Sequence, residues 1–190
     1  MSKSKMIVIS GCSGVGKNTV LGIMMKKRDD LLFSVSATTR QPRPDEIDGV
    51  HYYFVTREQF EEMIAKGEFL EYDAHNKYYY GTPRAQAVEK MEKGYVLLDI
   101  EPKGAAQVRK AMPEAKLIFI MPPSMEELER RLRGRGDTPE DQILLRLERA
   151  NWEMDQREWY DHVAVNILQQ ISYRGVKHSS SSKILSLIRQ

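Results

Sequence analysis

The chain has almost no cysteine. Cys12 is the single thiol among 190 residues, so an internal disulfide cannot form. This composition fits a reducing compartment, and we expect a cytoplasmic protein. Long apolar runs are also missing. No stretch approaches the roughly 18 residues of a membrane span, and the apolar run at 7–9 is too short for the core of a signal peptide. We therefore expect no membrane partner.

An excess of either charge is missing as well. Lys and Arg total 29 and Asp and Glu total 27, which leaves a formal net charge of +2. A protein that binds nucleic acid is usually clearly basic, so we expect no nucleic-acid partner. The near balance still allows a local basic pocket for a small anion.

Short apolar runs alternate with helical patterns along the chain. The runs are rich in β-branched residues and end at glycine, proline or acidic residues, which is typical of buried strands. They cover residues 6–10, 33–36, 95–100, 117–121 and 163–165. Strands that alternate with helices favour an α/β fold with a mostly parallel sheet flanked by helices. A length of 190 residues suits one domain, 1–190.

Capping signals predict where several helices begin. Residues 56–59 and the pair Ser124 and Glu127 match capping boxes. Thr82 and Pro83 suit a cap followed by a first-turn proline, and the segment T-P-E-D at 138–141 suits the cap of a long charged helix. A first helix is predicted from residue 16 to about residue 28, the glycines at 134 and 136 predict a helix break, and residues 179–182 resemble a linker before a short C-terminal helix.

The middle of the chain differs in composition from the rest. Residues 51–55, 69–72 and 78–80 are short aromatic runs that predict strands. Their concentration between residues 37 and 93 indicates an inserted antiparallel subdomain.

The strongest single motif is a glycine-rich loop between the first strand and the first helix. It matches G-x-x-x-x-G-K and consists of Gly11, Cys12, Ser13, Gly14, Val15, Gly16, Lys17, Asn18 and Thr19. Glycines let backbone N–H groups turn around a phosphate, and the helix N-terminus adds a positive dipole. We therefore predict ATP binding here, with Lys17 on the terminal phosphates. Asn18 stands where Ser or Thr usually holds Mg²⁺, so a metal contact through Asn18 is weak. A glycine-rich turn that merely contains lysine is the structural alternative.

A second basic segment follows the second strand. Arg40 and Arg43 lie three residues apart, and each guanidinium presents a fork that suits a phosphate. A solvated basic turn is the alternative interpretation of this segment alone.

Several motifs in order along residues 5–166 resemble the guanylate kinase family, P-loop kinases of nucleoside monophosphates. They are S-V-S-A-T-T-R-Q-P-R at 34–43, D-G-V-H-Y-Y-F at 48–54, E-F-L-E-Y at 68–72, Y-Y-G-T-P at 79–83, L-D-I at 98–100, P-P-S at 122–124 and R-L-R-G-R-G at 131–136. The resemblance implies a P-loop NTPase-type sheet with a core of 1–36, 95–124 and 158–190, a GMP-binding subdomain at 37–94 and a helical lid at 125–157.

The resemblance also implies roles for individual residues. The GMP phosphate would contact Ser36, Arg40, Arg43, Tyr52 and Tyr80. The guanine would contact Glu71, Thr82 and Glu101. Asp99 would help to position Mg²⁺ through water. The implied catalytic residues are Lys17, Arg40, Arg131, Arg135 and Arg146. Without the resemblance, Tyr52 and Tyr80 would be interpreted as core packing and the lid arginines as a solvated helix face.

The chain departs from the family pattern at a few positions. Glu101 stands where the family commonly has Asp, and Lys103 where it often has Gln. Residues 169–190 show no clear match.

The implied reaction is ATP + GMP = ADP + GDP, with ATP as co-substrate and Mg²⁺ as cofactor. Two alternatives remain open. One is a catalytically inactive guanylate-kinase-like module that binds proteins, and the other is a P-loop kinase for another monophosphate or a sugar phosphate. The expected partners are the small molecules GMP and ATP, in a monomer or a homodimer.

Overall fold

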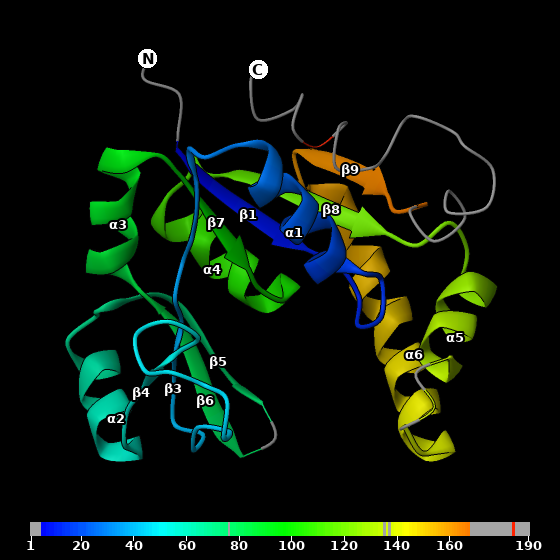
Figure 1. Ribbon diagram of the computed structural model, residues 1–190, viewed down its shortest axis with the longest axis horizontal. Helices are drawn as coiled ribbons and strands as arrows, with labels where there is room; N and C mark the ends of the chain where they lie inside the picture. Colours follow the sequence, from blue (N-terminus) through cyan, green and yellow to red (C-terminus); the bar gives the residue numbers. More distant parts are fainter. Residues whose placement is uncertain (1–4, 76, 135, 137, 168–183, 185–190) are drawn as a thin grey trace. The chain divides into compact units, whose positions relative to one another are not determined.

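The computed structural model describes residues 5–75, 77–134, 136, 138–167 and 184, which Figure 1 shows as a coloured ribbon. Strands alternate with helices, so the predicted α/β fold is confirmed. The chain divides into two compact units. Unit 1 comprises Met1–Ile7, Asp30–Leu98 and Lys103–Ala115, and unit 2 comprises Val8–Asp29, Asp99–Pro102 and Lys116–Gln190.

The larger sheet has five strands in the order β2-β7-β1-β8-β9. They are β1 (Met6–Ser10), β2 (Leu31–Phe33), β7 (Tyr95–Asp99), β8 (Lys116–Met121) and β9 (His162–Val165). In unit 1, β2 pairs with β7 in parallel, and in unit 2, β8 pairs with β9 in parallel. The mostly parallel sheet predicted from the apolar runs is confirmed. All five residues of β1 are buried, as expected for a strand covered on both faces.

One strand was predicted at the wrong place. The prediction put the second strand at 33–36, whereas β2 ends at Phe33. The segment after it turns to other partners. The Ser34 amide donates to the Leu97 carbonyl at 2.9 Å, and the Ser36 carbonyl accepts from the Tyr53 amide at 2.9 Å. The chain therefore passes from one sheet to the next within residues 34–36.

The smaller sheet lies in unit 1 and has the order β4-β3-β6-β5. Its strands are β3 (Ala37–Thr38), β4 (Tyr53–Phe54), β5 (Phe69–His75) and β6 (Tyr78–Pro83). β6 pairs antiparallel with both β3 and β5, while β3 and β4 are parallel. Helix α2 (Arg57–Ala65) lies beside this sheet (Figure 1). The ring of its Phe60 stacks on the rings of Phe69 and Tyr79, with centroid distances of 4.4 and 5.2 Å.

Some of the remaining helices begin where the capping signals predicted. They are α1 (Lys17–Lys27), α3 (Arg84–Lys93), α4 (Pro102–Ala111), α5 (Met125–Arg133), α6 (Glu140–Asp155) and the 3-10 helix η1 (Gln156–Trp159). The capping box at 56–59 forms, and Ser124 caps α5 by accepting from the Glu127 amide at 3.2 Å. The Glu127 carboxylate instead pairs with Arg130 and Arg131. Gly134 ends α5, as predicted.

One predicted cap was wrong. Thr82 belongs to β6, and Pro83 itself is the N-cap of α3, without a side-chain cap bond. The Thr82 hydroxyl is engaged across the sheet by Glu71. The predicted capping segment at 138–141 is confirmed as the start of α6, whose N-cap is Pro139. Apart from Ile184, which is helical and buried, the predicted C-terminal helix lies outside the described residues. Within the described part of the chain, every helix is too short or too polar to cross a membrane.

Candidate active site

The loop at residues 11–19 joins β1 to α1 in unit 2 and has the backbone of a phosphate cradle. Gly14 and Gly16 have φ values of 86° and 91°, a region that glycine adopts without strain. A Cβ atom at Gly11 would lie 2.4 Å from the Ile120 carbonyl oxygen, so no larger residue fits there. Gly16 caps α1 without a side-chain hydrogen bond, and the first turn of α1 has no acidic residue. This helix end therefore presents its positive dipole to an anion.

Lys17 points back along this loop. Its Nζ donates to the Gly11 carbonyl at 2.7 Å and lies 3.9 Å from Oδ1 of Asp99, at the carboxyl end of β7. Both side chains are mostly buried, at 18% and 19% exposure. Burial raises the pKa of Asp99, Lys17 opposes that rise, and the charge of Glu101 adds to it. The structure thus brings together the predicted phosphate lysine and the predicted metal carboxylate.

Asn18 and Thr19 lie on the first turn of α1 and are exposed, whereas Cys12 and Val15 are buried. Burial and the charge of Glu153 raise the pKa of Cys12 to about 11. The loop's side chains thus face inward at Cys12 and Val15 and outward at Asn18 and Thr19.

Arg131 holds the phosphate loop in place through a hydrogen bond to its backbone. It is 7% exposed. Its Nη1 donates to the Val15 carbonyl at 3.0 Å, its Nη2 to the Asn166 carbonyl at 3.0 Å and its Nε to Glu127 at 2.8 Å. The Asn166 amide donates to the same Val15 carbonyl at 2.7 Å. These contacts tie α5 and the segment after β9 to the loop.

The other predicted lid arginines are placed differently. Arg146 is half-buried on α6. Arg135 lies outside the described residues. Its neighbour Gly136 has a φ of 73°, consistent with the predicted break between α5 and α6.

In unit 1, Arg40 is the centre of a cluster of aromatic and charged side chains. Its guanidinium lies over the Tyr52 ring at 5.4 Å, and the Tyr52 and Tyr80 rings meet edge to face at 6.0 Å. Two hydrogen bonds of 2.9 and 2.8 Å join Arg40 to Glu46. Arg40 and the Arg43 amide lower the pKa of Glu46 to about 2. The structure thus brings together three of the residues predicted for the GMP phosphate.

The other two predicted phosphate ligands lie on the same stretch of chain. The Arg43 side chain is exposed, and its amide donates to Glu46 at 2.8 Å. Ser36 is partly buried and directly precedes β3.

Glu71 and Thr82 form a buried polar pair in unit 1. They face each other across β5 and β6, and the Thr82 hydroxyl donates to Oε1 of Glu71 at 2.6 Å. Glu71 is 6% exposed. The other carboxylate oxygen packs against α4, because a Cβ atom added at Gly104 would lie only 2.5 Å from Oε2. The carboxylate is therefore held between a hydroxyl and a helix backbone.

Glu101 follows β7 in unit 2, where it pairs with Arg149 of α6. Arg149 also donates from Nε to Glu153 at 3.1 Å. The predicted guanine ligand Glu101 is therefore one end of a chain of three charges.

Comparison with known proteins shows which family the chain belongs to. A family model described as guanylate kinase matches residues 3–178. The chain belongs to the guanylate kinase family. A guanylate kinase of Trichormus variabilis is 48% identical over 166 residues, which are 87% of this chain and 83% of that protein. One of Carboxydothermus hydrogenoformans is 47% identical over 167 residues, 87% of this chain and 82% of that protein.

Solved structures show the same similarity. A crystal structure of guanylate kinase from Anaplasma phagocytophilum has a TM-score of 0.70 and 33% sequence identity, and the match covers 97% of this chain and 84% of that chain. A shikimate kinase from Bacteroides thetaiotaomicron is 14% identical with a TM-score of 0.51, covering 97% and 98% of the two chains, and shares the fold.

Several residues around these guanylate kinase motifs were missed by the sequence analysis. They are Glu46, Gly104, Arg149, Glu153 and Asn166. Arg149 and Glu153 lie four residues apart on one helix, and this spacing indicates an ion pair. The contacts of the other three join segments that are distant or irregular in sequence, and no local pattern marks them.

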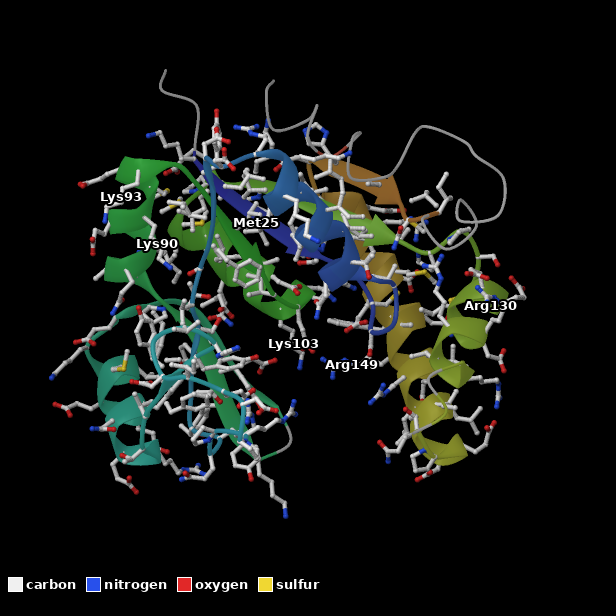
Figure 2. All side chains as sticks on the ribbon, in the orientation of Figure 1. Met25, Lys90, Lys93, Lys103, Arg130 and Arg149 are labelled. Carbon is white, nitrogen blue, oxygen red and sulfur yellow. The ribbon has the colours of Figure 1, made fainter. Side chains whose placement is uncertain are left out.

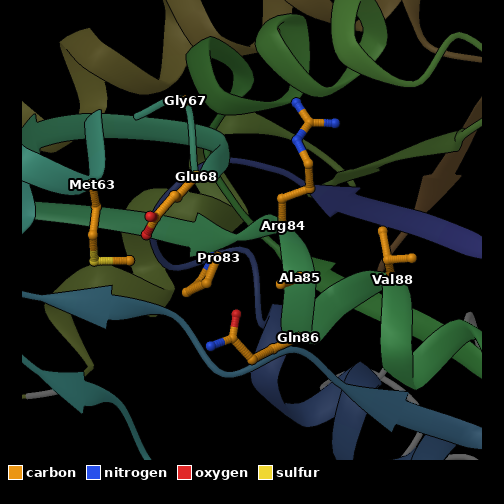
Figure 3. Close-up of a pocket in the computed structure, with 8 residues that line it drawn as sticks. All are labelled: Met63, Gly67, Glu68, Pro83, Arg84, Ala85, Gln86 and Val88. Atoms are coloured by element: carbon orange, nitrogen blue, oxygen red, sulfur yellow. The ribbon is translucent and has the colours of Figure 1, made fainter. Parts of the chain in front are cut away.

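A separate pocket of about 650 Å³ lies in unit 1 (Figure 3). Its lining residues are Met63, Gly67, Glu68, Pro83, Arg84, Ala85, Gln86 and Val88. None of them is a predicted site residue, so this pocket is not part of the candidate active site.

Proposed function

We propose that this chain transfers the terminal phosphoryl group of ATP to GMP and releases ADP and GDP. The observation that carries the proposal is the pairing of Lys17 with Asp99 beside a glycine cradle, in a chain of the guanylate kinase family. Ligand sites in open α/β sheets lie at the carboxyl ends of the strands, where Asp99 is found.

The phosphate loop acts by electrostatics and alignment. Backbone N–H groups of residues 11–19 and the positive end of α1 would surround the ATP phosphates. Lys17 would exchange its contact with the Gly11 carbonyl for a contact with the terminal phosphates. A GMP phosphate oxygen then forms a bond to the terminal phosphorus as the bond to the ADP oxygen breaks. No side chain has to act as a covalent nucleophile, so rate acceleration comes from positioning and charge.

The residues of the loop fit a magnesium ion bound together with ATP. Mg²⁺ prefers oxygen ligands and usually keeps several waters beside one or two carboxylates. Asp99 supplies such a carboxylate, and the exposed Asn18 supplies an amide oxygen. The described residues contain no group of three or more His, Cys, Asp or Glu side chains that would bind a metal without help. Water and phosphate oxygens would complete the shell, and the ion would neutralise phosphate charge.

The Arg40 cluster is proposed to bind the GMP phosphate. Glu46 accepts from Nη1 and Nη2 of Arg40 and holds the planar guanidinium beside Tyr52, so that its other N–H groups are oriented before a ligand arrives. Preorganised donors lose less entropy on binding than mobile ones. Ser36 and Arg43 complete this proposed set.

Glu71, Thr82 and Glu101 are proposed to read the guanine. Guanine presents adjacent donors, N1–H and the N2 amino group, and an ionised carboxylate accepts both. Adenine has an acceptor at N1 and no N2 amino group, so AMP would leave the buried Glu71 facing a lone pair. Such mismatches discriminate by roughly 10⁴ in other enzymes.

The proposed lid comprises residues 125–157, with Arg131, Arg135 and Arg146 as its positive charges. The core boundaries at 1–36, 95–124 and 158–190 and the GMP-binding subdomain at 37–94 also stay proposals. The lone buried Cys12 supports a reducing, cytoplasmic setting. Size-exclusion chromatography with light scattering decides between a monomer and a homodimer.

A coupled assay of ADP release with GMP, AMP, CMP and UMP tests the function. We expect GMP to be preferred over AMP by about 10⁴ in kcat/KM. Equal turnover with several monophosphates would favour a kinase of another substrate class. Binding of GMP without ADP release would favour the inactive module, although the presence of Lys17 in its cradle argues against it.

A further inference from the structure

Arg149 links two carboxylates of different exposure. It lies on α6 one turn before Glu153, so both side chains leave the same face of the helix. Its Nε donates to Oε1 of Glu153 at 3.1 Å, and its Nη2 pairs with Oε2 of Glu101. Figure 2 labels Arg149 at its position on α6. One guanidinium thus contacts an acidic residue of its own helix and an acidic residue that follows β7.

The two ends of this ion-pair chain are not equivalent. The Glu153 side chain is 4% exposed, whereas those of Arg149 and Glu101 are 36% and 43% exposed. The contact with Glu153 therefore anchors Arg149, and the contact with Glu101 reaches toward solvent. Half-exposed ion pairs contribute little to stability, because water screens them. The main consequence of the outer contact is the position of the Glu101 carboxylate.

The Glu101 carboxylate lies in a group of charged side chains, and its position depends on the cation that pairs with it. Asp99, Glu101 and Glu153 all lie in unit 2, and Arg149 pairs with two of these acidic residues, Glu101 and Glu153. Lys17 faces Asp99, whereas the cation that pairs with Glu101 is Arg149. Without Arg149, we expect the Glu101 side chain to turn away from this group.

We propose that Arg149 is a positioning residue for substrate selection: it holds the Glu101 carboxylate in the orientation that accepts a hydrogen bond from the guanine amino group. This inference rests on the proposed function, in which Glu101 reads the base. The N2 amino group of guanine is a hydrogen-bond donor, which a carboxylate such as that of Glu101 can accept. IMP has the same base edge without that amino group. The ratio of kcat/KM for GMP to that for IMP therefore measures this contact.

The experiment measures this ratio, with KM and kcat separated, for wild type and for Glu101→Gln, Arg149→Ala, Arg149→Lys and the double variant Glu101→Gln with Arg149→Ala. We expect Glu101→Gln to lower the ratio about tenfold, the usual effect of losing one hydrogen bond to a charged group. Arg149→Ala should lower it roughly three- to tenfold, through the KM for GMP and with kcat nearly unchanged. Arg149→Lys keeps the charge and should restore part of the ratio. The double variant should equal Glu101→Gln alone, because the two residues act on one contact.

Arg133→Ala is the matched control. Arg133 is also a half-exposed arginine of this region that pairs with two carboxylates, those of Glu129 and Glu140. It should leave the ratio unchanged. Circular dichroism checks folding, and Arg149→Gln, which keeps a donor for Glu153, replaces Arg149→Ala if the alanine variant does not fold.

The outcomes separate the inference from the function. A wild-type chain that fails to phosphorylate GMP refutes the proposed function. If GMP is used but Glu101→Gln leaves the ratio unchanged, Glu101 does not read the base and the role of Arg149 is refuted with it. If Glu101→Gln lowers the ratio and neither Arg149→Ala nor Arg149→Gln does, the function stands and the positioning role is wrong.

Discussion

Replacing Gly104 with Ala adds one methyl group beside the carboxylate of Glu71. The new Cβ would lie 2.5 Å from Oε2 and 3.2 Å from Cδ of Glu71. Ordinary contacts of this kind begin near 3.5 Å, so the carboxylate has to retreat by about 1 Å. It cannot retreat toward Thr82, whose hydroxyl is already 2.6 Å from Oε1, close to the shortest normal O–H···O distance. The side chain must change its torsion angles and leave the position proposed for reading guanine.

The effects on stability and on binding should differ in size. In a helix, Gly→Ala stabilises by about 0.5–1 kcal/mol. The displaced Glu71 rotamer costs about 0.5–1.5 kcal/mol. The net change in the free energy of unfolding should thus stay within about 1 kcal/mol. Losing a hydrogen bond between the charged carboxylate and guanine costs about 1.5–3 kcal/mol, which corresponds to roughly 10- to 150-fold in kcat/KM for GMP.

Steady-state kinetics and urea unfolding check this prediction. Gly22→Ala on α1 is the matched control, since a Cβ at Gly22 meets no atom within 4 Å. It should stabilise by about 0.5–1 kcal/mol and leave the kinetics unchanged. An unaltered kcat/KM for GMP in Gly104→Ala, in a folded protein, would show that the Glu71 position is irrelevant to base recognition.

Three further predictions follow from the phosphate loop. Lys17→Ala should lower kcat about 10²- to 10³-fold with an unchanged fold, as loss of a transition-state charge does in other enzymes; near-normal turnover would remove Lys17 from the mechanism. Arg131→Ala should lower the free energy of unfolding by about 3 kcal/mol, because it removes the hydrogen bonds of a buried guanidinium to Glu127 and to the carbonyls of Val15 and Asn166; thermal unfolding measures this, and unchanged stability with reduced kcat would make Arg131 a lid arginine only. Cys12 should resist alkylation at pH 8, since a pKa of about 11 makes its thiolate about 100-fold scarcer than at the ordinary value of 9.0. Because the folded state favours the neutral thiol, its contribution to stability is complete below about pH 9 and is lost as pH rises toward 11. Rapid labelling of folded protein at pH 8 would contradict this.

The features that the sequence determined by itself are local ones. The apolar runs placed β1, β7, β8 and β9 within a residue or two, and the glycine spacing placed the phosphate loop between β1 and α1. The motifs in register led to the guanylate kinase family, which the family model confirmed. Buried strands and loops with positive φ depend on a few consecutive residues, whose side chains and backbone preferences are already visible in the sequence.

Contacts between distant segments were decided only by the tertiary structure. Thr82 has the local pattern of a helix cap, yet its hydroxyl bonds to Glu71, eleven residues away. Arg131 has the pattern of a solvated helix residue, yet it donates to carbonyls 116 and 35 residues away. A polar side chain satisfies its hydrogen bonds with whichever partner the fold places beside it. Burial makes an unpaired group costly, so the strongest polar contacts formed where packing had excluded water, which no local pattern reveals.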